Sequence, residues 1–270
     1  MKRNRGISQV ISAVILASVS VTLIIAFLGY AIVTLETASQ QAEFERAKSL
    51  MKTLAEETVN TVLTGVGSEI NFPSRTLRLN LITSNDDISL QFLLNGSPPT
   101  PGQLWVTVAS SFLTVTCLGG EFVSGENEVI YGLRENLAFV DDAYFLPLVQ
   151  SFWNVSEGRV AVSINFTRLL YQEFNYSNTL VIELSYINAT WQIEEEASGE
   201  ILEIRYLGSN TITLYEGYIS GLTNATFHLS LNNGLVDIGD PDNNPRLRYG
   251  IQNCNLIVRL IIHNVLYKVR

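Results

Sequence analysis

The sequence predicts an α+β protein, in which a long N-terminal hydrophobic helix is followed by an antiparallel β-sandwich head domain. Two observations lead to this prediction. Residues 7–35 carry no charge and no proline occurs before Pro73, so nothing interrupts a helix in the first part of the chain. From about residue 70, short apolar runs alternate with turn residues, a pattern typical of antiparallel strands.

The first element is the apolar segment 7–35, which follows the basic residues Lys2, Arg3 and Arg5. As a helix it would be about 43 Å long, and a bilayer core of about 30 Å needs about 20 residues. A removable secretion signal has an apolar region of only about 7–15 residues. The segment therefore predicts a retained, single-pass membrane span. The positive-inside rule places its N-terminus in the cytoplasm and the body outside the cell.

The charge of the chain argues against one class of partner. The 270 residues have a formal net charge of −9, which becomes −12 without the three basic leader residues. Binding of nucleic-acid phosphates requires clustered Lys and Arg, so we expect no nucleic-acid partner. About 235 residues follow the span, enough for one large domain or two subdomains.

The helix is predicted to continue through residues 36–64, where it becomes amphipathic. One helical face collects residues at spacings of three and four: Phe44, Ala47, Met51, Leu54, Thr58 and Val62. Gly65 and Gly67 form the stop signal. A helix over 7–64 would be about 87 Å long, which favours a membrane span that continues into a stalk. The amphipathic part can pack on its own head or on neighbouring helices, and both alternatives stay open.

Short alternating runs predict the strands of an extracellular domain over residues 70–270. They lie at 76–81, 88–94, 104–118, 159–166, 179–187, 200–207, 211–219, 225–231 and 255–269. Residues 127–154 are less regular, and the pattern does not decide between one sandwich and two subdomains. No helix-length segment separates the strands, so a doubly wound α/β fold is not expected.

The N-terminus resembles the precursors of archaeal type IV pilins and archaellins. Those precursors carry a short basic leader that ends in Lys/Arg-Gly, and a prepilin peptidase in the membrane cleaves after the glycine. The resemblance implies a leader (a class III signal peptide) over residues 1–6 and a processing site at Arg5, Gly6 and Ile7. Ser8 and Gln9 are polar, as residues after the cut often are. The family also places a β-sandwich head after the helix.

The resemblance implies an archaeal type IV pilin-like surface subunit. Such a subunit is assembled into, or initiates, a cell-surface filament with other pilin subunits, and depends indirectly on an assembly ATPase and a membrane platform. Bacterial pilins carry Glu at the fifth mature position, where this chain has Ile11, as is common in archaea. A mature chain only six residues shorter than the 270 of the precursor is large for an abundant archaeal pilin, which favours a minor pilin.

Small residues in the apolar segment permit close approach of helices. They are Ser12, Ala13, Ala17, Ser18, Ser20, Ala26 and Gly29. Filament packing uses such residues, although any membrane span contains some. The alternative function is an unprocessed, single-pass membrane-anchored protein whose extracellular β-sandwich binds a cell-envelope component. Processing at Gly6 distinguishes the two.

Six Asn-X-Ser/Thr sequons follow the span and are candidates for N-glycosylation of an exported body. They begin at Asn95, Asn154, Asn165, Asn175, Asn188 and Asn224. A sequence rich in Asn, Ser and Thr contains some sequons by chance, and Pro98 makes Asn95 the poorest of the six.

Two cysteines, Cys117 and Cys254, are candidates for a disulfide between an early strand and the C-terminal strand, because an oxidising exterior permits one. Such a bridge would close a long loop, worth about 4–5 kcal/mol in the chain-entropy model. Two buried free thiols are the alternative.

Signals for an enzyme are weak. His228 and His263 each lie in a strand pattern, and neither is in a metal-ligand spacing. Asp237, Asp240 and Asp242 form a dense acidic loop, which is a weak candidate for Ca²⁺ and is explained equally well as a plain turn. We therefore expect no catalytic site, no cofactor and no metal. An anchored extracellular enzyme is the remaining alternative.

Overall fold

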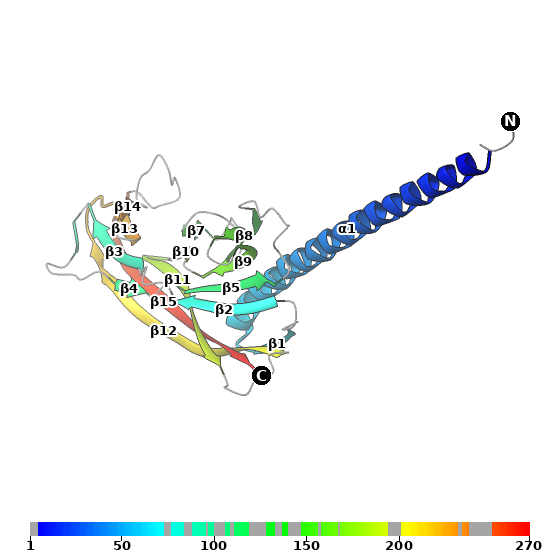
Figure 1. Ribbon diagram of the computed structural model, residues 1–270. Coiled ribbons are helices and arrows are strands. Elements are labelled where there is room, and N and C mark those ends of the chain that lie inside the picture. Colours follow the sequence, from blue (N-terminus) through cyan, green and yellow to red (C-terminus); the bar gives the residue numbers. More distant parts are fainter. Residues whose placement is uncertain are drawn as a thin grey trace.

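The computed structural model consists of one long helix that projects from a β-rich head (Figure 1). This arrangement confirms the α+β class. The structure describes residues 5–72, 77–83, 88–95, 97–99, 106–108, 111–118, 128–132, 137–139, 147–155, 158–166, 168–193, 201–231, 234–237 and 250–270.

Helix α1 (Arg5–Thr64) is continuous over 60 residues, about 90 Å at 1.5 Å per residue. It ends where the sequence predicts. The Gly65 amide donates to the Thr61 carbonyl at 2.9 Å, and the φ of +70° at Gly65 is the left-handed conformation that favours glycine at a helix C-terminus. A Cβ atom at Gly67 would lie 2.7 Å from the Ile204 carbonyl oxygen, so only glycine lets the chain pass this strand so closely.

The head contains three sheets. A six-stranded sheet, the long sheet, has the order β1 (Ser68–Asn71), β12 (Ile201–Ile219), β15 (Cys254–Val269), β11 (Thr179–Ile193), β10 (Leu169–Tyr176), β7 (Leu137–Phe139). A five-stranded sheet has the order β2 (Leu77–Thr83), β5 (Ser111–Cys117), β9 (Arg159–Asn165), β8 (Leu148–Asn154), β6 (Val129–Tyr131). A four-stranded sheet has the order β14 (Gly234–Asp237), β13 (Ala225–Leu231), β3 (Ile88–Leu94), β4 (Val106–Val108).

The prediction of a purely antiparallel head is wrong in the long sheet. Strand β15 runs parallel to β11, in register from Thr179 opposite Asn255 to Ile193 opposite Val269. Strand β7 also runs parallel to β10. The reason is topological, because β15 inserts between β11 and β12, which follow each other in the sequence. The intervening β12, β13 and β14 provide the long connection that a parallel pair requires.

The long sheet carries two hydrophobic cores on opposite faces. On β15, Leu256, Val258 and Leu260 belong to one cluster, whereas Val265 and Tyr267 belong to the other. Side chains alternate between the faces of a strand, so the change from even to odd positions moves the core across the sheet. Strand β11 changes in the same way between Tyr186 and Ile187.

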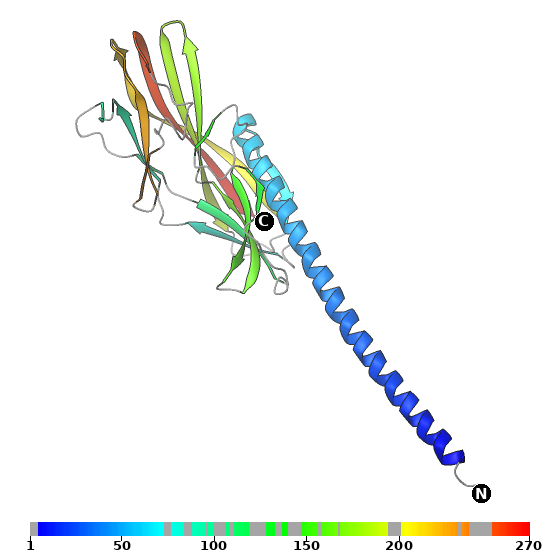
Figure 2. The ribbon, with the colours of Figure 1, turned by 90° about the horizontal axis from the view of Figure 1, so that it is seen from above.

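The helix-side core joins α1 and the five-stranded sheet to one end of the long sheet, and the distal core joins the four-stranded sheet to its other end. Both views show the long strands passing from the helix toward the far end of the head (Figure 2). The head is therefore built as three curled sheets around two cores.

Candidate functional site

The candidate site is α1. Its first half is apolar and exposed, and its second half is amphipathic and buries one face in the head. From Val10 to Leu35 every residue is exposed, with fractions between 51% and 73% for the large hydrophobic side chains. The described residues contain one helix that is long enough and apolar enough to span a bilayer, and it is α1. No part of the head covers this segment in either view (Figures 1 and 2).

Four hydroxyl groups in or just after the apolar half donate hydrogen bonds within the helix. Ser18 and Thr22 donate to the carbonyls four residues earlier at 2.8 and 2.9 Å, and Thr34 and Thr37 do the same at 2.8 Å each. A polar group without a partner is costly in a medium that lacks water. These four bonds remove that cost for four of the hydroxyl groups, in lipid or in a bundle of apolar helices.

Gly29 is the one glycine in the apolar segment 7–35, so it is the position at which no side chain covers the helix backbone. No atom lies within 4 Å of a Cβ built on Gly29, so its own chain does not require the glycine. Glycine inside a helix destabilises it by about 0.5–1 kcal/mol relative to alanine. Close approach of a second helix would be a reason to keep glycine here.

Beyond Phe44 one face of α1 is buried in the head. Ala47, Met51 and Leu54 are at most 1% exposed and lie in the helix-side core, as the sequence periodicity predicts. Contacts of α1 with β9, β12, β5 and β8 account for this burial. Of the two alternatives for the amphipathic part, the structure shows packing on its own head.

A buried hydrogen bond joins α1 to the C-terminal strand. The Tyr267 hydroxyl lies 2.6 Å from Thr58 Oγ1, and Thr58 in turn donates to the Leu54 carbonyl at 2.7 Å. Tyr267 is fully buried, and burial raises the pKa of its hydroxyl far above the usual value although the bond with Thr58 acts to lower it. The neutral phenol therefore holds the helix and β15 together at any physiological pH.

Lys48 forms a second link at the edge of the same interface. Its Nζ lies 3.0 Å from Glu45 on α1 and 3.0 Å from Glu128 beside β6, and 4.6 Å from the centre of the Phe44 ring. Burial acts to lower the pKa of Lys48, but hydrogen bonds and charge from Glu128 and Glu45 outweigh it and raise the pKa. The sequence analysis missed both links, although Thr58 in an apolar helical stripe is a signal that a buried polar partner exists.

The predicted processing residues Arg5, Gly6 and Ile7 lie in the first turn of α1. The rest of the leader lies outside the described residues. The predicted cut would therefore fall in the first turn of the helix. Its first residue with described burial is Val10.

The six sequon asparagines differ in accessibility. Asn95, Asn175 and Asn224 are exposed, and Asn154, Asn165 and Asn188 are half-buried. Asn188 Nδ2 donates to Asn264 Oδ1 at 2.9 Å across the β11–β15 pair, so its amide already has a partner in the sheet. Asn175 lies in the exposed end of β10.

The prediction of a Cys117–Cys254 disulfide is wrong for this structure, in which both thiols are free. Cys117 lies in the helix-side core at the end of β5, and Cys254 lies against the distal core at the start of β15. A bridge requires Cα atoms within about 7 Å, and the two cores occupy opposite faces of the long sheet. Burial, with a smaller contribution from Glu43, raises the pKa of the Cys117 thiol to about 11.

The candidate Ca²⁺ loop is described only at Asp237, the last residue of β14, because Asp240 and Asp242 lie outside the described residues. His228 lies in β13. His263 Nδ1 lies 3.2 Å from the Tyr206 hydroxyl, and burial lowers the pKa of His263. Within the described part of the chain, no three His, Cys, Asp or Glu side chains are grouped to hold a metal.

Comparison of the chain with known protein families, with curated proteins and with solved structures finds no match.

Proposed function

We propose that the chain is an archaeal type IV pilin-like surface subunit, in the rank of a minor pilin. In this proposal a prepilin peptidase removes residues 1–6, and the mature N-terminus at Ile7 opens an apolar helix that packs with other pilin helices in a cell-surface filament. In the same proposal the head is a β-sandwich that carries exposed sequons and lies outside the cell.

The observation that carries the proposal is the contrast between the two halves of one uninterrupted helix. Beyond Phe44 one face of the helix is buried in the head, whereas from Val10 to Leu35 the helix is exposed on all sides. Burying a large apolar side chain is worth about 1.5–3 kcal/mol, so the exposed half requires either lipid or other helices. The bilayer satisfies this requirement before assembly. After the helix is extracted from the bilayer, the other helices of the filament satisfy it.

Processing at Gly6 tests the proposal. The protein is produced in an archaeal host with a prepilin peptidase, and the N-terminus is read by mass spectrometry in the membrane fraction and in sheared filaments. We expect wild-type protein that begins at Ile7, at least partly in the sheared fraction. Gly6→Val should remain uncut and membrane-bound, whereas Asn4→Val, a matched change inside the leader, should still be cut.

The second candidate function is the unprocessed single-pass anchor. The observation that favours it is that the apolar part of α1 is long enough to span a bilayer as a single helix. A wild-type chain that begins at Met1 or Lys2 and does not shear off with filaments would replace the pilin proposal with this one.

A further inference from the structure

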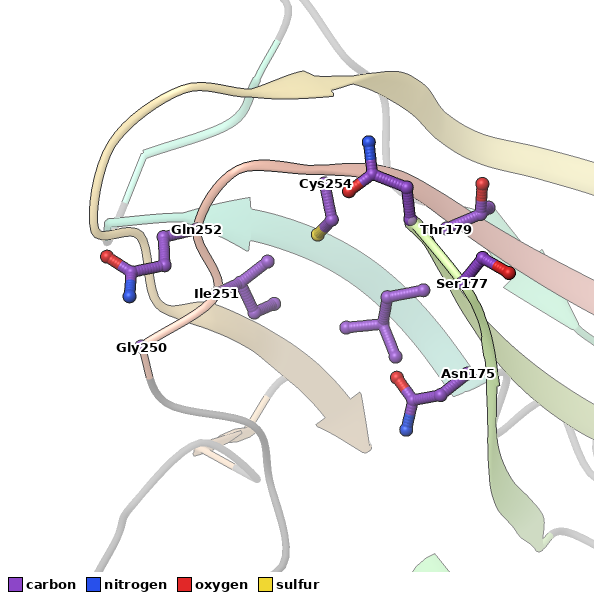
Figure 3. A pocket seen from close by; sticks show the side chains of 9 residues that line it. Asn175, Ser177, Thr179, Gly250, Ile251, Gln252 and Cys254 are labelled. Carbon is purple, nitrogen blue, oxygen red and sulfur yellow. The ribbon is translucent and has the colours of Figure 1, made fainter.

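A pocket of about 220 Å³ lies in the head at the end of the long sheet away from α1. It is formed where the turn between β10 and β11 meets the residues that lead into β15 (Figure 3). Backbone hydrogen bonds hold both sides of the pocket in place. The Asn255 amide donates to the Asn178 carbonyl at 2.8 Å, and Ile251 exchanges two bonds of 2.9 Å with Thr223.

The lining combines uncharged hydrogen-bonding groups with a small apolar floor. Asn175, Ser177, Asn178, Thr179 and Gln252 contribute hydroxyl and amide groups. Leu180 and Ile251, both in the distal core, contribute the apolar part. None of the nine lining residues is charged, so the pocket lacks the groups that recognise phosphates, carboxylates or cations.

We propose that this pocket binds one ring of a neutral sugar. Sugar hydroxyls donate and accept at once, as do the amides of Asn and Gln and the hydroxyls of Ser and Thr. The C–H face of the ring would lie on Leu180 and Ile251. The volume is below the roughly 300–1,000 Å³ of sites for drug-sized ligands, which fits a single ring.

A neutral sugar in this pocket has two sources, and the sequence contains a candidate for one of them. Asn175, at the pocket wall, is the first residue of the sequon Asn175-Tyr176-Ser177. The sugar can be the first unit of a glycan on Asn175 or a sugar from another molecule. The proposal does not depend on the pilin function, because the pocket lies in the head and α1 takes no part in it.

The test uses the full chain produced without glycosylation, held in nanodiscs because many detergents carry sugar headgroups. Saturation-transfer NMR is recorded with glucose, galactose, mannose and N-acetylglucosamine as probes, with glucuronic acid as the charged comparison. We expect transfer to at least one neutral sugar and none to glucuronic acid. Peptide mapping of the native protein at Asn175 then separates the sources: an occupied site indicates the chain's own glycan, and an empty one an external sugar.

A matched pair of double variants attributes the binding to the pocket. Asn178→Ala with Gln252→Ala removes two lining amides, and Asn210→Ala with Gln192→Ala makes the same changes at exposed positions of β12 and β11 outside it. Transfer should fall at least fivefold in the first variant and stay unchanged in the second, with both unfolding at the wild-type temperature. Equal transfer in the two variants, or none to any neutral sugar in the wild type, would overturn the proposal.

Discussion

At the scale of single residues, the buried polar groups decide how α1 is held. Tyr267 is fully buried and bonds Thr58, whereas Tyr218 on the same sheet is 58% exposed. The sequence predicts the buried face of the helix correctly, because spacing is a local property. It does not predict the partner of Thr58, because Tyr267 lies 209 positions away and reaches it only through the fold.

Replacing Tyr267 with Phe should lower the free energy of unfolding by about 0.5–1.5 kcal/mol, because one buried hydrogen bond is lost with little change in volume. Tyr218→Phe is the control and should change it by less than about 0.5 kcal/mol. Urea unfolding followed by tryptophan fluorescence measures both. Equal effects of the two variants would mean that the Thr58 bond contributes nothing.

The Cys117 thiol predicts a dependence of stability on alkaline pH. Its pKa is about 11 in the folded chain and 9.0 ordinarily, so between these pH values the unfolded chain releases a proton that the folded chain retains. The stability is therefore full below about pH 9 and decreases as the pH rises toward 11. Tyr267 acts in the same direction, so the contribution of Cys117 is the part of the slope that Cys117→Ala removes. An unchanged slope in that variant would contradict the prediction.

At the scale of elements, α1 has two halves that the sequence distinguishes and the structure separates. Its length, its end at Gly65 and its buried face are all predictable from composition and period. The position of β15 is not, because strand patterns do not say which strands pair. The insertion of β15 between β11 and β12 depends on contacts between segments far apart in the chain. The pocket at the end of the long sheet could not be predicted for the same reason, since its walls come from β10, β11 and the residues that lead into β15.

Leu54 and Leu63 compare the two faces of α1 with the same substitution. Leu54 is 1% exposed in the helix-side core and Leu63 is 69% exposed. Leu54→Ala should cost about 2–5 kcal/mol of unfolding free energy, and Leu63→Ala less than about 0.5 kcal/mol. Thermal unfolding in detergent compares them. A similar loss in both would indicate that α1 does not pack on the head as described.

Gly29→Leu probes helix packing outside the head. A Cβ at this position lies within 4 Å of no atom outside the local helix backbone, so the stability of the head should stay unchanged. If α1 packs in a filament, the amount of sheared filament should fall strongly, because a bulky residue separates the helices. Ile32→Leu keeps the volume and is the control. Filament yields that fall equally in both variants would contradict a role of Gly29 in close packing.

At the scale of the whole molecule, the projecting part of α1 and the part that packs on the head belong to one continuous helix. Only a short polar stretch separates the apolar half of α1 from Phe44, the first residue buried in the head. If the apolar half lies in a bilayer or in a helix bundle, the head would therefore lie close to the surface of that bilayer or bundle. This shape, with two cores on opposite faces of a common sheet, was not predictable from the alternation pattern alone. The pattern marks buried faces but not where a core changes side.

The predicted orientation gives a prediction for spheroplasts. Added protease should digest the head and leave a protected fragment that contains residues 7–35, because the positive-inside rule predicts that the basic leader keeps the N-terminus inside. Immunoblotting for a C-terminal tag and mass spectrometry of the protected fragment measure this. A C-terminal tag that survives digestion of intact spheroplasts and is lost only after lysis would reverse the predicted topology.

The central position of β15 has a consequence for the timing of folding. The last sixteen-residue strand of the chain supplies side chains to both cores and lies between strands made much earlier. Neither core can therefore close before β15 has been synthesised. If the head is exported as proposed, it would reach the membrane unfolded, and a chain that stops before β15 would leave both cores open to proteolysis. Synthesis of β15 is in this way the checkpoint for a stable head.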